Sequence, residues 1–155
     1  MGFVMHSDAR KFFERIGIRK RPGSKSTTGK FTTYFDAYWL SAQIGMVNDS
    51  FEAPDGSAPE MTRKIVGDSA EFRSLIYGVG FYYYCKNKAM VNSDDDLLKE
   101  MSKFFSEDHQ ALNDDGYALF NGYAHGGFNL IYNLLGDHCY ELSEFLVECY
   151  DLLGE

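Results

Sequence analysis

The sequence predicts an all-α protein, a compact bundle of five or six helices. Apolar residues recur at spacings of three and four along most of the chain, which is the period of an amphipathic helix. Ser, Thr or Asp residues stand where these segments begin, and glycine stands where several of them end. The chain has only three prolines, all in polar stretches, so the remainder is free to be helical. A length of 155 residues suits one domain with a real core.

The first 30 residues combine a short helix with a basic loop. Ser7 or Asp8 can cap the helix, and Gly17 ends it. The stretch 17–30 is rich in Gly, Ser, Thr and Pro, and this composition makes it flexible unless something anionic orders it. The apolar face of the helix consists of Phe12, Phe13 and Ile16.

A second helix and a long acidic connection follow. Thr32 or Thr33 caps this helix, which extends to about Ile44, and Gly45 fits the left-handed residue that terminates a helix. Residues 47–66 then form the connection, with a Pro-Asp-Gly turn signal inside it. Either a short hairpin or an extended excursion fits this segment, and it is where we expect any β-structure.

Polar caps also mark the third and fourth helices. Asp68 or Ser69 opens the third helix, in which Gly78 and Gly80 are tolerated because another helix approaches closely. Ser93 and the three aspartates after it begin the fourth helix, since carboxylates complement the positive end of the helix dipole. The apolar stripe of the third helix is predicted to contain Phe72, Leu75, Ile76, Val79 and Tyr83.

The C-terminal part predicts two more helices. An acidic pair at 114–115 begins the fifth helix, and Gly136 closes it. The pair Gly126-Gly127 inside it costs up to about 2 kcal/mol relative to two alanines. Close approach of another helix, or a break between two helices, would account for that pair. Residues 138–154 form a last amphipathic segment, with inward positions Leu142, Phe145, Leu146, Cys149 and Leu153.

Charge divides the chain into two parts. Residues 1–30 have a balance of +6, whereas residues 31–155 have a balance of −14. Such asymmetry indicates contact with a polyanion or a charged docking arm. We therefore predict a basic N-terminal helix and loop, or arm, over residues 1–30, and an acidic helical domain over residues 31–155. The candidate partner-binding or nucleic-acid-binding residues of the arm are Arg15, Arg19, Lys20, Arg21, Lys25 and Lys30.

Two kinds of partner suit the arm. One is an acidic protein surface. The other is nucleic acid, because Lys and Arg contacts to phosphates give salt-dependent, sequence-independent affinity. The acidic body would repel a duplex beyond the arm, so docking to protein is the preferred interpretation and direct DNA binding is the alternative.

Aromatic residues make up 16% of the chain, a high share that suits half-buried surfaces and interfaces. The run Tyr82-Tyr83-Tyr84 places rings around a full helix face, and a helix that is apolar all round is central or serves an interface. We predict core packing together with partner contact. The candidate partner-binding aromatic residues are Tyr82, Tyr84 and Tyr123.

No pattern indicates a catalytic or metal site. Residues 23–30 look like a phosphate loop, but five residues instead of four precede the Gly-Lys pair, and Phe31 follows where Ser or Thr is needed. The four histidines are dispersed, so exposed or helix-capping roles are expected for them. We therefore expect no enzymatic activity, no metal and no cofactor.

The three cysteines follow no metal-ligand spacing and are typical of a reducing compartment. No apolar run is long enough to span a bilayer, and no secretory signal is visible. These features predict a cytoplasmic protein that does not contact membranes.

Two segments together resemble a known group of proteins. The first is the block Thr32-Thr33-Tyr34-Phe35-Asp36-Ala37-Tyr38-Trp39-Leu40-Ser41-Ala42-Gln43-Ile44-Gly45-Met46. The second covers 117–135, with the centre Tyr123-Ala124-His125-Gly126-Gly127-Phe128, and Phe72-x-x-Leu75-Ile76 lies between the two. This arrangement resembles small accessory proteins encoded beside bacterial DNA-phosphorothioation (Dnd) genes and in related phage-defence loci.

The resemblance covers roughly residues 30–135 and carries no known catalytic residues. It implies a non-catalytic accessory subunit of a DNA-acting anti-phage defence complex, docking larger protein subunits. The chain departs from the group in its basic N-terminal extension and in its helix after Gly136. These parts are therefore expected to be specific to its own partners.

Overall fold

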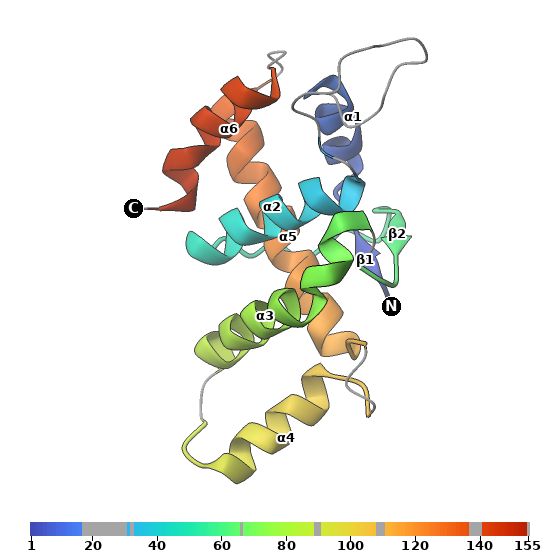
Figure 1. Ribbon diagram of the computed structural model, residues 1–155, viewed down its shortest axis with the longest axis vertical. Coiled ribbons are helices and arrows are strands. Elements are labelled where there is room, and N and C mark those ends of the chain that lie inside the picture. The colour runs from blue at the N-terminus through green and yellow to red at the C-terminus, as the bar shows by residue number, and fades with distance from the viewer. Residues whose placement is uncertain are drawn as a thin grey trace.

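The computed structural model describes residues 1–16, 31, 33–65, 67–88, 91–107, 111–136 and 141–154. Within these residues six α-helices and one small antiparallel sheet are present, so the expected mostly α-helical bundle is confirmed (Figure 1). In chain order the elements, with η for a 3₁₀ helix, are β1 (Phe3–Val4), α1 (Ser7–Ile16), α2 (Tyr34–Val47), β2 (Glu60–Thr62), η1 (Gly67–Phe72), α3 (Arg73–Lys88), α4 (Asp94–Phe104), α5 (Asp114–Leu135), α6 (Leu142–Tyr150) and η2 (Asp151–Leu153).

The crossing of α2 and α5 forms the centre of the molecule (Figure 1). The two backbones touch there, because a Cβ built on Gly127 would lie 1.8 Å from the carbonyl oxygen of Ser41, and one on Gly45 would lie 2.0 Å from that of Tyr123. The close approach expected at the glycine pair of α5 is therefore confirmed. The expectation that Gly45 terminates α2 is wrong, because the helix continues to Val47 and needs this glycine for the crossing.

Three of the predicted helix starts are correct, and one of them is the start of α5 at Asp114. Thr33 caps α2 in a reciprocal capping box with Asp36, and Ser93 caps α4 by accepting a hydrogen bond from the backbone N–H of Asp96. Gly136 ends α5 with a positive φ of 58°. The first helix begins slightly earlier than expected, since Nδ1 of His6, rather than a side chain of Ser7 or Asp8, accepts the hydrogen bond from the Asp8 N–H at 3.2 Å.

The small sheet joins the N-terminus to the acidic connection. β1 pairs with β2, so the hairpin considered for residues 47–66 is wrong. Asn121 also anchors the N-terminal strand to α5: its Oδ1 accepts a hydrogen bond from the Val4 N–H at 2.8 Å, and its Nδ2 donates to the Gly2 carbonyl at 2.9 Å. Because the anchor for β1 lies on a distant helix, the hairpin pattern around 47–66 gave no sign of it.

Residues 1–16 belong to the folded body. Phe3 lies at 0% exposure in the cluster built on α5, and Phe12 and Phe13 pack in a second buried cluster with Phe128 and Phe145. The predicted boundary that assigns residues 1–30 to an arm therefore does not hold for residues 1–16. Residues 17–30 lie outside the described part of the chain.

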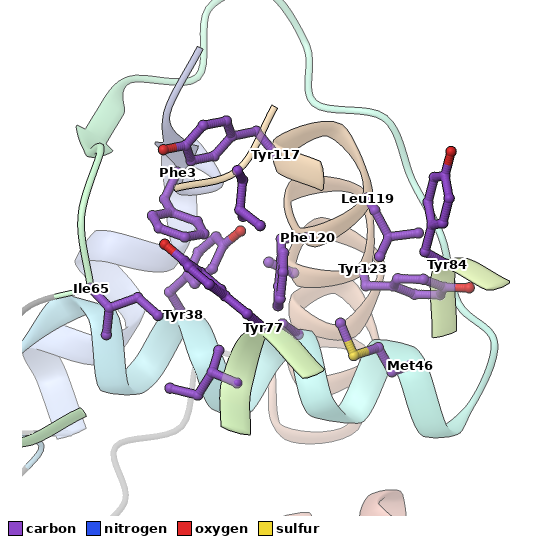
Figure 2. Close-up of a cluster of buried hydrophobic side chains, with 14 of the residues drawn as sticks. Phe3, Tyr38, Met46, Ile65, Tyr77, Tyr84, Tyr117, Leu119, Phe120 and Tyr123 are labelled. Carbon is purple, nitrogen blue, oxygen red and sulfur yellow. The ribbon is translucent and has the colours of Figure 1, made fainter. Parts of the chain in front are cut away.

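The buried face of α3 differs from the predicted stripe. Ile76, Tyr77 and Tyr84 point into the core, whereas Phe72 and Leu75 are exposed. The cause is Phe120 of α5, which lies in the buried cluster of Figure 2. Its ring occupies the position that a Cβ on Gly80 would need, so Gly80 sets the contact face. Close approach at Gly80 is thus confirmed, but Gly78 faces open space and the same explanation is wrong there.

At the C-terminal end, α6 packs Phe145 and Cys149 inward, while Leu146, expected to be inward, is exposed.

Among the described helices none is both long and apolar enough to cross a lipid bilayer.

Candidate protein-docking surface

Of the predicted basic arm, the structure describes Arg15 alone. It lies in the last turn of α1, and its guanidinium carbon lies 5.8 Å from the ring centroid of Phe12. Five further candidates lie outside the described residues, namely Arg19, Lys20, Arg21, Lys25 and Lys30.

The three aromatic candidates do not share a surface. Tyr82 is 63% exposed on α3, whereas Tyr84 and Tyr123 are each 1% exposed in the core (Figure 2). The hydroxyl of Tyr84 donates to Glu100 at 3.0 Å, and that of Tyr123 donates to Asp49 at 3.2 Å. Burial also raises the pKa of Tyr123 to about 12, so this phenol stays neutral. Tyr84 and Tyr123 are structural residues in this fold, and Tyr82 is the one available for partner contact.

The structure brings a different set of residues together in a groove between α3 and α4. The groove has a volume of about 450 Å³ and a mostly apolar lining. In Figure 1, α3 and α4 lie below the α2–α5 crossing, apart from α1 and α6. The lining residues are Arg73, Ser74, Tyr77, Gly78, Phe81, Met101 and Phe105.

Aromatic rings form the base of this groove. The ring centroids of Phe81 and Phe105 lie 5.5 Å apart, and those of Tyr77 and Phe105 lie 6.2 Å apart. Burial raises the pKa of Tyr77 to about 12, so no charge develops on this ring near neutral pH. The base is therefore a neutral, apolar surface in which a hydrophobic side chain can be buried.

The walls of the groove are adaptable. Met101 contributes an unbranched thioether chain, which fills irregular gaps and is common at surfaces that accept varied partners. Gly78 lacks a side chain, and no atom lies within 4 Å of the position its Cβ would take. A partner backbone can therefore approach α3 closely at this point.

Exposed apolar residues continue beyond the groove. Leu75 and Tyr82 on α3 and Leu98 on α4 each expose more than half of their accessible surface. Isolated exposed hydrophobic residues are normal, but several beside an apolar groove mark a contact surface. Tyr82 of this surface is predicted from the sequence, whereas the groove is not, although the rings on more than one face of α3 are a signal for it.

A buried histidine was also missed. His125 is 3% exposed, and its Nδ1 donates to the Asn121 carbonyl at 2.9 Å, which leaves Nε2 as the unprotonated nitrogen. This Nε2 is buried without a hydrogen-bond partner in the described residues, and the ring lies 5.3 Å from that of His6. Burial lowers the pKa of His125, so the ring is neutral and packs as part of the core. The dispersed spacing of the histidines gave no hint of this pairing.

The two cysteine thiols in the described part of the chain are poorly suited to act as nucleophiles. Burial raises the pKa of the Cys149 thiol to about 12 and also raises that of Cys85, so both thiols are protonated and weak nucleophiles. In the ranges that the structure describes, no three His, Cys, Asp or Glu residues come together as a metal site.

Comparison with known proteins gives no relative: no family model, curated protein or solved structure matches this chain.

Proposed function

We propose that the chain is a non-catalytic subunit that docks other proteins through the groove between α3 and α4. The observation that carries this proposal is the apolar groove with its base of Tyr77, Phe81 and Phe105. A small-molecule site can also be mostly apolar with a few polar groups. Exposed large apolar residues on the same two helices, Leu75, Tyr82 and Leu98, favour a protein partner here. An apolar side chain presented by another protein fits this lining better.

The partner element is an amphipathic helix. Such a helix places apolar residues at i, i+3 and i+7 into a groove between two helices of its receptor. Gly78 lets its backbone approach α3, and Met101 adjusts to the shape of the inserted side chain. The residues that cover most area on binding are then the aromatic ones at the base.

The setting we propose is a DNA-acting anti-phage defence complex, in which this chain is an accessory subunit. Support for this setting is the resemblance of residues 30–135 to small proteins encoded beside DNA-phosphorothioation genes. The groove supplies the means of attachment to larger subunits.

The groove is tested with Met101→Lys, which places a charge in its lining at a half-buried position. The tagged protein is recovered from its native cells, and bound proteins are quantified by mass spectrometry. We expect Met101→Lys to reduce the recovery of a specific partner by roughly tenfold, because an uncompensated charge in the centre of an interface is costly. Val147→Lys on α6 is the matched control, since Val147 is a 70% exposed apolar residue on another helix. Equal partner recovery by both variants would overturn the proposal.

A second candidate function is sequence-independent nucleic-acid binding by the basic N-terminal residues, favoured by the +6 balance of residues 1–30. Mobility-shift assays over a salt series test it. Binding must weaken steeply with salt and collapse when Arg19, Lys20 and Arg21 are changed to Ala. Binding that is absent, or that ignores salt, eliminates this candidate.

A further inference from the structure

We infer that the outer face of α3 pairs with the same face of a second copy of the chain, antiparallel and related by a two-fold axis. This pairing goes beyond the proposed docking role, and it shares Gly78 with the lining of the groove. It uses one stripe of exposed residues, called here the α3 stripe. The α3 stripe consists of Glu71, Leu75, Gly78, Tyr82 and Lys86.

The α3 stripe has the spacing of a helix-pairing seam. Its members are separated by four, three, four and four residues, and all are exposed. Spacings that alternate between three and four keep side chains on one line along a helix, as in antiparallel and parallel coiled coils. Glu71 belongs to η1, which directly precedes α3, and it lies four residues before Leu75. Leu75 and Tyr82 are large side chains that are 64% and 63% exposed. Contact with water alone does not explain why such large side chains stand at these positions.

The α3 stripe is complementary to itself. A two-fold axis between Gly78 and Val79 sets Leu75 of one copy against Tyr82 of the other. The same axis sets Glu71 against Lys86 of the second copy, so opposite charges meet at both ends. A two-fold interface requires a surface to match itself in this way, with each contact made twice. Apolar residues at the centre and opposite charges at the ends meet that requirement.

Gly78 lies at the centre of the proposed contact. Because no atom lies within 4 Å of the position of its Cβ, this part of α3 is open to a neighbour. Two helices approach most closely where their side chains are smallest, and glycine at the crossing allows the flanking Leu75 and Tyr82 to interlock. Elsewhere in the fold Gly45 of α2 and Gly127 of α5 serve such a crossing within one chain, and Gly80 of α3 meets the ring of Phe120. Gly78 is therefore the glycine of α3 that no contact within the described chain explains.

The contacts around Lys86 and Tyr82 favour a defined orientation of the stripe. Tyr82 packs edge-on against Tyr83, with ring centroids 5.3 Å apart, and the ammonium of Lys86 lies 5.5 Å from the Tyr83 centroid. These contacts hold both side chains near the surface of α3 before a partner arrives. Ordering them on association is therefore less costly.

The inference is tested by charge exchange on the full chain. Sedimentation equilibrium, from low micromolar to submillimolar concentration, should show a monomer–dimer equilibrium. Lys86→Glu and Glu71→Lys should each weaken dimerisation roughly fivefold, because each creates two like-charged contacts across the axis. The double variant Glu71→Lys/Lys86→Glu restores opposite charges and should recover the wild-type dissociation constant. Lys99→Glu, the same charge change at an exposed position on α4, is the control and should leave the dimer unchanged.

The outcomes separate this inference from the proposed function. A wild-type chain that stays monomeric at every concentration overturns the pairing, as does a dimer whose single variants are silent or whose double variant fails to recover. Neither result bears on the groove, which is judged by partner recovery with Met101→Lys. That groove variant should itself dimerise normally. Circular dichroism confirms that each variant is folded, as expected for exposed positions.

Discussion

The carbonyl oxygen of Ser41 lies against Gly127, where a Cβ would stand only 1.8 Å away. This contact joins the backbones of α2 and α5 directly, without side chains between them. The relation is reciprocal, because Gly45 of α2 lies against the Tyr123 carbonyl of α5 in the same way. The position of every other helix depends on this crossing, since both buried clusters draw residues from α2 and α5.

Gly127→Ala should therefore be among the most damaging substitutions in the chain. The new methyl group meets backbone on a neighbouring helix, which cannot move aside as a flexible side chain can. We expect a loss of about 3 kcal/mol in the free energy of unfolding, the upper range for overpacking a tight core. Urea denaturation followed by circular dichroism measures it. A loss below about 1 kcal/mol is the size of a helix-propensity effect alone. Such a small loss would contradict direct contact between the backbones of α2 and α5.

Gly78→Ala should have the opposite effect on the monomer. The glycine is helical and exposed, and its Cβ position is free of neighbours. Alanine lowers the conformational freedom of the unfolded chain and favours the helix. We therefore expect the free energy of unfolding to increase by about 1 kcal/mol. Urea denaturation at low protein concentration, where any self-association is negligible, tests this. A destabilised variant would show that Gly78 is needed within the single chain.

The comparison of these two glycines shows what the sequence could and could not predict. Helix starts follow local chemistry, so Thr33 and Ser93 were assigned correctly as caps. The role of a glycine depends on which helix lies opposite, and spacing along one chain does not contain that information. Gly127 and Gly78 therefore received the same explanation, which holds for Gly127 alone.

Long-range pairing limited the prediction in the same way. The N-terminal strand β1 is anchored by Asn121, which is 117 residues from Val4 in the chain. The groove between α3 and α4 depends on which face of α3 the ring of Phe120 holds inward. Local periodicity placed Leu75 in the core, whereas a contact to a distant helix turned it outward. The candidate surface was thus found in part through Tyr82 and otherwise only from the fold.

Asn121 should be essential for stability, because it satisfies three groups at once. Its Oδ1 accepts from the Val4 N–H and from the Tyr38 hydroxyl, each at 2.8 Å, and its Nδ2 donates to the Gly2 carbonyl. Asn121→Leu leaves these groups buried without partners, and we expect a loss of about 4 kcal/mol. Tyr38→Phe is the matched comparison. It removes one donor while Val4 still satisfies the acceptor, so the expected loss is about 1 kcal/mol. Equal losses in the two variants would show that Asn121 acts through packing rather than through its hydrogen bonds.

His125 should make the fold sensitive to mild acid. Burial is the main reason that its pKa lies below the ordinary value of 6.5, with the nearby His6 adding to the effect. Hydrogen bonding to the Asn121 carbonyl and the charges of Glu52 and Asp55 oppose it. Between the lowered pKa and 6.5 the unfolded chain binds a proton that the folded chain excludes, so the free energy of unfolding rises with pH in this window. The contribution of His125 to the free energy of unfolding is complete above pH 6.5 and declines as the pH falls below that value.

The His125→Gln variant isolates this effect, because glutamine does not titrate. Urea denaturation of both proteins at a series of pH values measures the free energy of unfolding. Below pH 6.5 this free energy should fall more steeply with decreasing pH for the wild-type chain than for the variant. His6→Gln is the comparison: it removes the smaller contribution of the neighbouring imidazole and keeps the buried one, so most of the acid loss should remain, because burial is the larger cause. If the His125→Gln profile runs parallel to the wild-type profile, then His125 has the same pKa folded and unfolded, and its burial does not control the acid response. If the two profiles converge at low pH, then the buried Nε2 is the group whose protonation the fold resists.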